Sequence, residues 1–211
     1  LYHLAAMVDD HLMNISHVFR GAEWLSTFPL HGHIIRAFGW QQPEFVHLSL
    51  FLNPSGKGKM SKRDSGQSTR EGPSIFVTDL RNLGYLPEAA INWIALMGWG
   101  HNEPDDFFTL PDLIEKFSLK GLTPSPAAIN FTKFDHFNGL HIRSLALDDL
   151  AHRVQPFMQA AGYNVTEQQL LPMMPLIRER LVTLDEAPQW IGFFFEKEVE
   201  PNPAELVGDK M

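Results

Sequence analysis

Cysteine is absent from the 211-residue chain, which excludes disulfide bonds and metal sites built from thiolates. Long apolar runs are also missing, because no stretch approaches the roughly 20 apolar residues that a membrane-spanning helix needs. Positive charge is scarce: 17 Lys and Arg stand against 25 Asp and Glu, and the formal net charge is -8. Hydrophobic residues still make up 44% of the chain, which predicts a folded core in one large domain or two small ones.

The scarce positive charge is concentrated in one short segment. Four cations lie within the run Gly56-Lys57-Gly58-Lys59-Met60-Ser61-Lys62-Arg63. Asn, Pro, Ser and Gly surround this run, and these residues favour a turn or a loop over a helix. A lysine on a flexible backbone can reach a phosphate group. The run therefore indicates either a phosphate-contacting loop or a basic patch that touches nucleic acid without specificity.

The same run carries a family resemblance. Lys59-Met60-Ser61-Lys62-Arg63 resembles the KMSKS motif of class I aminoacyl-tRNA synthetases, in the form ending in Arg that is usual in the glutamate branch. Five other segments resemble bacterial-type glutamyl-tRNA synthetases in order and spacing, namely 2–4, 8–13, 18–27, 83–89 and 137–143. The chain is therefore identified as similar to that family from Tyr2 to about Gly162.

This resemblance implies an α/β fold followed by helices. Residues 1–66 would form the C-terminal part of a class I Rossmann-like catalytic domain, including the KMSKS loop. Residues 67–143 would form a mainly helical connector that contacts the tRNA stem, and residues 144–211 would begin an all-α anticodon-binding domain. The pattern of apolar residues agrees, because only helical spacing remains after Arg143.

Local patterns predict the individual elements. Strands are expected over 1–8, 15–19 and 45–52, and helices over 29–38, 74–83, 87–97, 109–117, 147–161, 166–181 and 183–194. Glycines at 84 and 162 are expected to end helices. Capping boxes are expected for the pairs Thr109 and Asp112, Thr166 and Gln169, and Thr183 and Glu186.

Arg20 comes at the end of the predicted strand 15–19. Its planar guanidinium can hold a carboxylate through two parallel hydrogen bonds, whereas its alternative role would be a structural ion pair. By the resemblance, the glutamate pocket is lined by Tyr2, Arg20, Gly21, Ala22, Glu23 and Trp24. Ala22 stands where the family more often has Glu, which leaves the outer contacts of this loop open.

The resemblance also implies the ATP contacts. These are Glu23, Phe51, Lys59, Met60, Ser61, Lys62 and Arg63. Lys59 and Lys62 would be the catalytic residues, since cations on a closing loop stabilise charge that develops on a triphosphate. Mg²⁺ is expected to accompany ATP, but no ligand for it can be assigned. No protein-held metal is expected either, because His31 and His33 stand two apart on a predicted helix and cannot share one face.

The implied activity is ATP-dependent ligation of glutamate to tRNA(Glu) through glutamyl-adenylate, by a cytoplasmic monomer without membrane association. Three alternatives stay open: an enzyme of the glutamyl-queuosine type, a glutaminyl-tRNA synthetase, and a non-catalytic tRNA-binding module. The helices expected after Arg143 disfavour the first, and segment 2–27 disfavours the second. The joint presence of Arg20, Lys59 and Lys62 disfavours the third. Whether tRNA(Gln) is also charged is left open.

The first signature of the class, of the HIGH type, is not found in the sequence, and the string His31-Gly32-His33 does not replace it. Because the chain also begins with Leu1 inside the family's catalytic domain, we expect it to be a fragment. The purified chain should therefore catalyse no glutamate-dependent pyrophosphate exchange, even with tRNA supplied. Exchange above an enzyme-free control would contradict this expectation.

Overall fold

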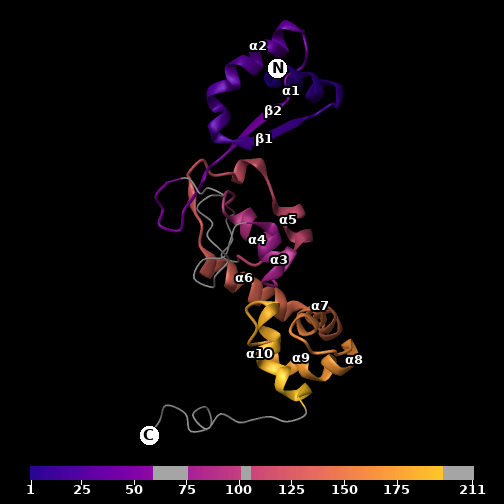
Figure 1. Ribbon diagram of the computed structural model, residues 1–211. Helices are drawn as coiled ribbons and strands as arrows, with labels where there is room; N and C mark the ends of the chain where they lie inside the picture. The colour runs from indigo at the N-terminus through magenta and orange to yellow at the C-terminus, as the bar shows by residue number, and fades with distance from the viewer. Residues whose placement is uncertain (59–75, 101–105, 197–211) are drawn as a thin grey trace. The chain divides into compact units, whose positions relative to one another are not determined.

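The computed structural model describes residues 1–58, 76–100 and 106–196 (Figure 1). The chain divides into two compact units. The first unit contains Leu1–Asp64 and Ile94–Asn130, and the second contains Ser65–Trp93 and Phe131–Met211. Helix α4 (Pro87–Leu96) begins in the second unit and ends in the first.

The first unit is an α/β structure with two small parallel sheets. Besides the end of α4, its elements are α1 (Tyr2–Leu12), β1 (His17–Gly21), the 3-10 helix η1 (Ala22–Thr27), α2 (Phe28–Ala37), β2 (Glu44–Leu48), β3 (Phe51–Leu52), α5 (Leu110–Lys116), η2 (Leu119–Gly121) and β4 (Ala127–Ala128). Strand β1 pairs with β2 in a register that sets Arg20 opposite His47. Helix α2 connects these two strands and packs on α1, as Figure 1 shows.

The second unit is helical throughout its described part. Its elements are α3 (Val77–Asn82), the first part of α4, α6 (Phe131–Ser144), α7 (Leu147–Ala160), α8 (Glu167–Leu170), η3 (Leu171–Met173), α9 (Met174–Ile177), η4 (Leu184–Glu186), α10 (Ala187–Ile191) and η5 (Gly192–Phe195). The all-helical pattern predicted after Arg143 is therefore confirmed.

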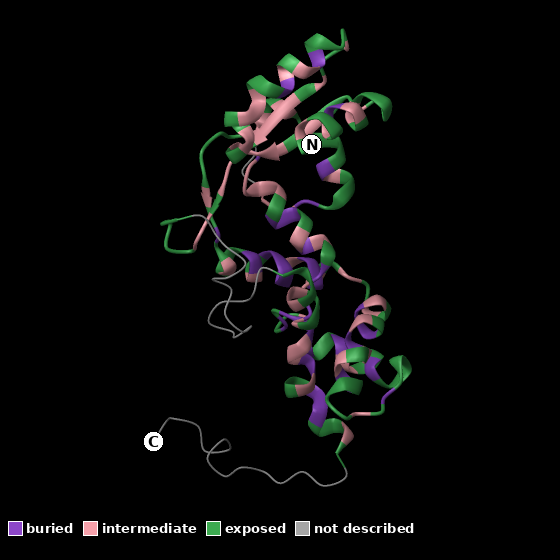
Figure 2. Ribbon diagram, turned by 45° about the horizontal axis from the view of Figure 1, so that its top comes forward, coloured by how far each residue is buried: buried purple, intermediate pink, exposed green. Residues whose placement is uncertain are grey.

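The core of the second unit is built around α6 and α7. Phe134 is fully buried and stacks on Trp93, with ring centroids 4.3 Å apart, and on Tyr85, at 4.2 Å. In Figure 2 the buried residues, in purple, appear on several helices of the molecule. Asn138 is buried as well, and its side chain accepts a hydrogen bond from the Leu86 amide and donates one to the Val182 carbonyl. Both the oxygen and the nitrogen of this amide thus have a hydrogen-bond partner inside an apolar core.

The strand predicted over 1–8 is wrong, because these residues belong to helix α1. A short apolar run does not by itself distinguish a strand from a helix. Here Leu4, Ala5, Ala6 and Met7 all favour a helix, and Val8 is the only β-branched residue. The helix ends just before Asn14, which adopts the left-handed conformation with φ 53°. Asparagine tolerates this conformation better than most residues other than glycine.

Other predicted elements are confirmed with shifted limits. The strand 15–19 is β1, two residues later, and the run 45–52 forms two strands, β2 and β3, which pair with different partners. Helix 166–181 is divided into α8, η3 and α9 because Pro172 and Pro175 lack the amide hydrogen that a continuous helix needs. The helix predicted over 74–83 is α3, with Phe76 at the N-cap position, and the start of the predicted range, residues 74 and 75, lies outside the described residues.

Two of the three capping boxes are confirmed. Thr109 with Asp112 and Thr166 with Gln169 make both reciprocal hydrogen bonds. The third, Thr183 with Glu186, is wrong. Glu186 accepts from the Val182 amide instead of the Thr183 amide, and the Thr183 hydroxyl donates to Asp185.

Gly84 and Gly162 provide a matched test of packing in the second unit. Both have positive φ, +79° and +95°, as predicted for residues that end helices. A Cβ at Gly84 would lie 2.6 Å from the Leu184 amide nitrogen, whereas a Cβ at Gly162 would meet nothing within 4 Å.

We expect Gly162→Ala to lower the free energy of unfolding by about 1–2 kcal/mol, through left-handed strain alone. Gly84→Ala should cost about 1–3 kcal/mol more, because the backbone around Leu184 must move. Urea unfolding of the two variants, followed by circular dichroism, measures the difference. Equal destabilisation would mean that the contact between Gly84 and Leu184 does not form.

Candidate active site

The candidate site lies in the first unit and is centred on Arg20, on β1. The guanidinium Nε donates a hydrogen bond to His47 Nε2 at 3.1 Å, and Nη1 donates to His31 Nδ1 at 2.7 Å. Its Cζ lies 4.7 Å from the centroid of the Phe45 ring and 5.7 Å from that of Phe28. Nη2 is buried and has no hydrogen-bond partner among the described residues. Four side chains therefore fix the guanidinium plane and leave one donor nitrogen unused.

The strand pairing and α2 explain why these side chains meet. The β1–β2 register sets His47 directly beside Arg20. The crossover helix α2 then carries His31 on its buried side, with 1% of the side chain exposed. His33, two residues further, is exposed, so the two histidines lie on different sides of the helix.

Helix α1 adds three further side chains to the cluster. His3 Nδ1 lies 2.9 Å from His31 Nε2, which extends the hydrogen bonds of Arg20 to a third imidazole. The Tyr2 ring lies 5.3 Å from the ring of Trp24, centroid to centroid, and forms an aromatic wall with it. Asp10 is close enough to Arg20 and His31 to interact with both electrostatically.

Burial and neighbouring charge shift the pKa values in this cluster. Burial lowers the pKa of His31 and of His47 below the usual 6.5, and the adjacent Arg20 charge lowers both further. Burial and the neighbouring Asp9 raise the pKa of Asp10, against the opposing effect of His31 and Arg20. Burial also lowers the pKa of Arg20, although a guanidinium stays charged at any ordinary pH. The result is one cation that contacts two imidazoles, His31 and His47, whose neutral forms are favoured.

The segment after β1 has a close-packed geometry. Gly21 ends the strand, and a Cβ at this position would lie 2.0 Å from the Glu23 carboxylate oxygen Oε2. Glycine therefore gives the Glu23 carboxylate the space to fold back toward the strand end. Ala22, Glu23 and Trp24 form the first turn of η1.

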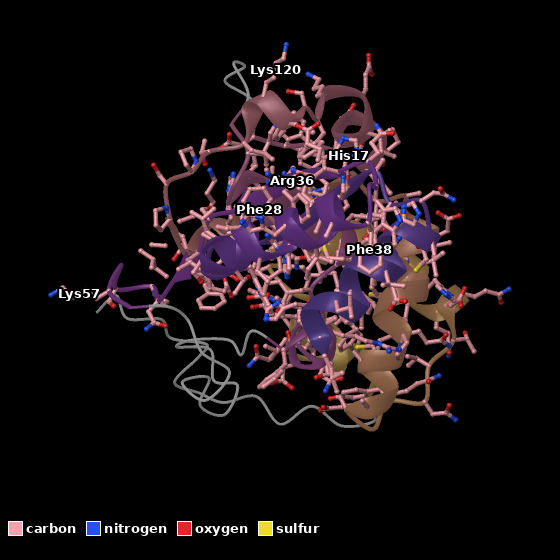
Figure 3. The ribbon with its side chains drawn as sticks, turned by 90° about the horizontal axis from the view of Figure 1, so that it is seen from above. His17, Phe28, Arg36, Phe38, Lys57 and Lys120 are labelled. Carbon is pink, nitrogen blue, oxygen red and sulfur yellow. The ribbon has the colours of Figure 1, made fainter. Side chains whose placement is uncertain are left out.

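The predicted nucleotide side is described in part. Phe51 lies in β3 with 37% of its side chain exposed. The turn that follows is held by the Asn53 side chain, which donates to the Lys57 carbonyl, and by positive φ at Gly56 and Gly58. Lys57 is exposed and points outward (Figure 3). Lys59, Met60, Ser61, Lys62 and Arg63 lie outside the described residues.

The structure brings together Tyr2, Arg20 and Trp24, which the sequence predicted as pocket residues. It adds His3, His31 and His47, which sequence reasoning missed as site residues. The available signal was weak, since His31 was considered only with His33 as a metal pair. In the described ranges 1–58, 76–100 and 106–196, no group of three His, Cys, Asp or Glu residues could hold a metal ion.

A separate cavity of about 360 Å³ adjoins α1. Its lining includes Asp10, Asn14, Trp40, Gln41 and Gln42. None of the predicted glutamate or ATP contacts lines it, but Asp10 belongs both to this lining and to the Arg20 cluster, so the cavity adjoins the cluster. As for membranes, no helix in the part of the chain that the structure describes is long and apolar enough to cross one.

Comparison with known proteins defines the class. The family "tRNA synthetases class I (E and Q), catalytic domain" matches residues 1–136, and "Anticodon binding domain" matches residues 149–211. The chain belongs to the class I tRNA synthetases of this E and Q family. The predicted order, an α/β catalytic domain followed by a helical anticodon domain, is thereby confirmed.

Comparison with individual proteins is more specific than the family match. The chain is 42% identical to the glutamate–tRNA ligases of Herpetosiphon aurantiacus and Chloroflexus aurantiacus, over 99% and 100% of its length and 42% of each relative. The glutamate–tRNA synthetase structure of Elizabethkingia anophelis matches 96% of this chain and 43% of its own, with TM-score 0.79 and 30% identity. A glutamate tRNA ligase from Elizabethkingia meningosepticum, in complex with its amino acid, matches 96% of this chain and 42% of its own, with TM-score 0.80 and 31% identity. The chain thus spans about 42% of the length of the curated relatives that it matches.

Proposed function

We propose that this chain is part of a glutamate–tRNA ligase, which activates glutamate with ATP to glutamyl-adenylate and transfers the glutamyl group to the 3' end of tRNA(Glu). The proposal includes a cytoplasmic monomer, with domain limits near residues 66 and 143. The named relatives support the reaction class. The assignment of glutamate as the amino acid substrate rests on the chemistry of the Arg20 cluster.

The unused nitrogen of Arg20 is the observation that carries this proposal. A buried guanidinium nitrogen without a partner is unfavourable, because it has lost water and gained no hydrogen bond. A ligand carboxylate would supply that bond, with charge assistance. We assign the side-chain carboxylate of glutamate to this position, with Arg20 as the binding residue.

The surroundings of Arg20 fit such a ligand. The Tyr2 and Trp24 rings provide an apolar wall for the methylene groups of a glutamate side chain. Because Gly21 has no Cβ, the Glu23 carboxylate lies beside the strand end, where it can accept from an amine or a ribose hydroxyl. The related enzyme that was crystallised with its amino acid supports a pocket of this kind.

The ATP side of the proposal rests on Phe51 and the basic run. Phe51 presents an exposed aromatic face on β3, just before the glycine-rich turn that leads to Lys59 and Lys62. Lys59, Met60, Ser61, Lys62 and Arg63 would close over the triphosphate, where the two lysines stabilise the charge that develops during attack on the α-phosphate. Mg²⁺ is expected with ATP, but the described residues offer no group of ligands for it, so no step is assigned to it.

Arg20→Ala in a full-length ligase carrying this segment should raise the KM for glutamate far more than the KM for ATP. The lost charge-assisted hydrogen bond is worth about 1.5–3 kcal/mol, or roughly 10- to 150-fold. Aminoacylation kinetics with each substrate varied in turn measure both constants. Arg36→Ala, at an exposed position on α2, is the matched control and should change neither. Equal increases in both constants for Arg20→Ala would reject the glutamate assignment.

Lys62→Ala should slow adenylate formation about 10²–10³-fold while ground-state glutamate binding stays nearly unchanged. The reason is that loss of a contact made mainly in the transition state lowers kcat and not affinity. Lys57→Ala is the control, because Lys57 is exposed and points into solvent. Single-turnover kinetics of the same full-length ligase measure both variants. Small and equal effects would favour the non-catalytic alternative, a basic loop that only touches tRNA.

A further inference from the structure

We infer that His31 and His47 are positioning residues that orient the Arg20 guanidinium for the substrate carboxylate and leave its positive charge uncompensated. The inference rests on the proposed function, since it assigns the two histidines to the same glutamate site. It concerns residues that do not touch the substrate themselves. They act through Arg20.

The geometry of the guanidinium carries this inference. Arginine offers five N–H donors in one rigid plane, on three nitrogens. His47 takes Nε and His31 takes Nη1, from two different elements, β2 and α2. The Phe45 ring lies against the plane itself, 4.7 Å from Cζ. The three contacts fix both the position and the rotation of the group, and Nη2, which has no partner among the described residues, is left for a ligand.

The chemical nature of the partners matters as much as their position. Carboxylates are the usual partners of a half-buried arginine, and they neutralise its charge. Neutral imidazoles accept the same hydrogen bonds without neutralising it. Arg20 is therefore held by two hydrogen bonds that do not neutralise it, while Asp10 interacts with it only electrostatically, and its positive charge is offered to an incoming carboxylate.

The hydrogen bonds fix the tautomer of each ring. Arg20 can only donate, so His31 accepts at Nδ1 and carries its proton on Nε2, from which it donates to His3 Nδ1. His47 accepts at Nε2 and therefore carries its proton on Nδ1. Burial and the Arg20 charge disfavour the protonated form of both rings and thus support this arrangement.

Acid should disrupt the arrangement. The titratable groups that face Arg20 are Tyr2, His3 and Asp10 from α1, His31 from α2 and His47 from β2. When His31 or His47 gains a proton, it loses its acceptor nitrogen and repels the guanidinium. Since both pKa values lie below 6.5, the KM for glutamate should be flat at neutral pH and rise as the pH falls below 6.5.

The first test uses the 211-residue chain itself. Two-dimensional ¹⁵N–¹H NMR of the imidazole nitrogens at pH 7.5 should show the Nε2–H tautomer for His31 and the Nδ1–H tautomer for His47. Assignment follows from His31→Asn and His47→Gln, each of which removes one set of signals. The opposite tautomer at either ring, or a protonated ring at this pH, would overturn the inference without bearing on the reaction.

The second test uses a full-length ligase carrying this segment. His31→Leu and His47→Leu each remove an acceptor and should raise the KM for glutamate roughly three- to tenfold, with the KM for ATP unchanged. His31→Asn and His47→Gln keep an acceptor oxygen near the lost nitrogen and should restore most of the affinity. Combined in one protein, these two substitutions should also remove the rise in KM below pH 6.5 that the unmodified ligase shows, because neither acceptor can then be protonated. His33→Leu, on the exposed side of α2, is the control.

The outcomes separate this inference from the proposed function. If the leucine variants leave the KM for glutamate unchanged while Arg20→Ala raises it, the histidines do not position Arg20 and the proposed function stands. If Arg20→Ala also has no effect, the glutamate site itself is wrong. Asp10→Asn identifies the source of any remaining acid dependence, because the Asp10 carboxyl faces the same cluster. An acid rise that disappears with Asp10→Asn and persists in the histidine variants would overturn the inference.

Discussion

The parallel pairing of β1 with β2 is the constraint on which the candidate site depends. It sets Arg20 opposite His47, and the helix that a parallel crossover requires supplies His31. Helix α1 packs on that crossover helix and brings Tyr2 and His3 to the same place. A shift of one residue in the register would turn Arg20 to the other face of the sheet and separate all these contacts. The site is therefore a product of strand register more than of any local motif.

Charge is used sparingly in this acidic chain. One arginine is partly buried among neutral acceptors, while Lys57, at the start of the basic run, is left in solvent. The second unit contains an arginine with the more usual carboxylate partners. There Arg153 is paired with Glu88 and Asp149, and its charge is compensated within the protein. The contrast supports a ligand role for Arg20 and a structural role for Arg153.

The sequence predicted what local chemistry determines and missed what tertiary contacts determine. The boxes at Thr109 and Thr166 form as expected, because each needs only residues three apart. The run 1–8 was predicted as a strand but forms part of a helix. A short apolar run fits either structure, and only its packing decides between them. Arg20 and Trp24 could be found because the resemblance points to them. His31 and His47 could not, since they stand 11 and 27 residues from Arg20 and only the β1–β2 pairing brings them together.

The contact between Gly84 and Leu184 has a consequence for synthesis of the chain. The second unit is discontinuous, because Ser65–Trp93 packs with Phe131–Met211. The Leu184 amide donates to the Gly84 carbonyl at 3.2 Å, so this bond joins residues that a ribosome makes far apart in time. At about 5–20 residues per second, the segment around Gly84 waits roughly 5–20 seconds for its partner. Part of the native cover of this segment arrives earlier, because Phe134 of α6, which stacks on Tyr85 and on Trp93 of α4, is made before Leu184, and the Gly84 turn is completed last.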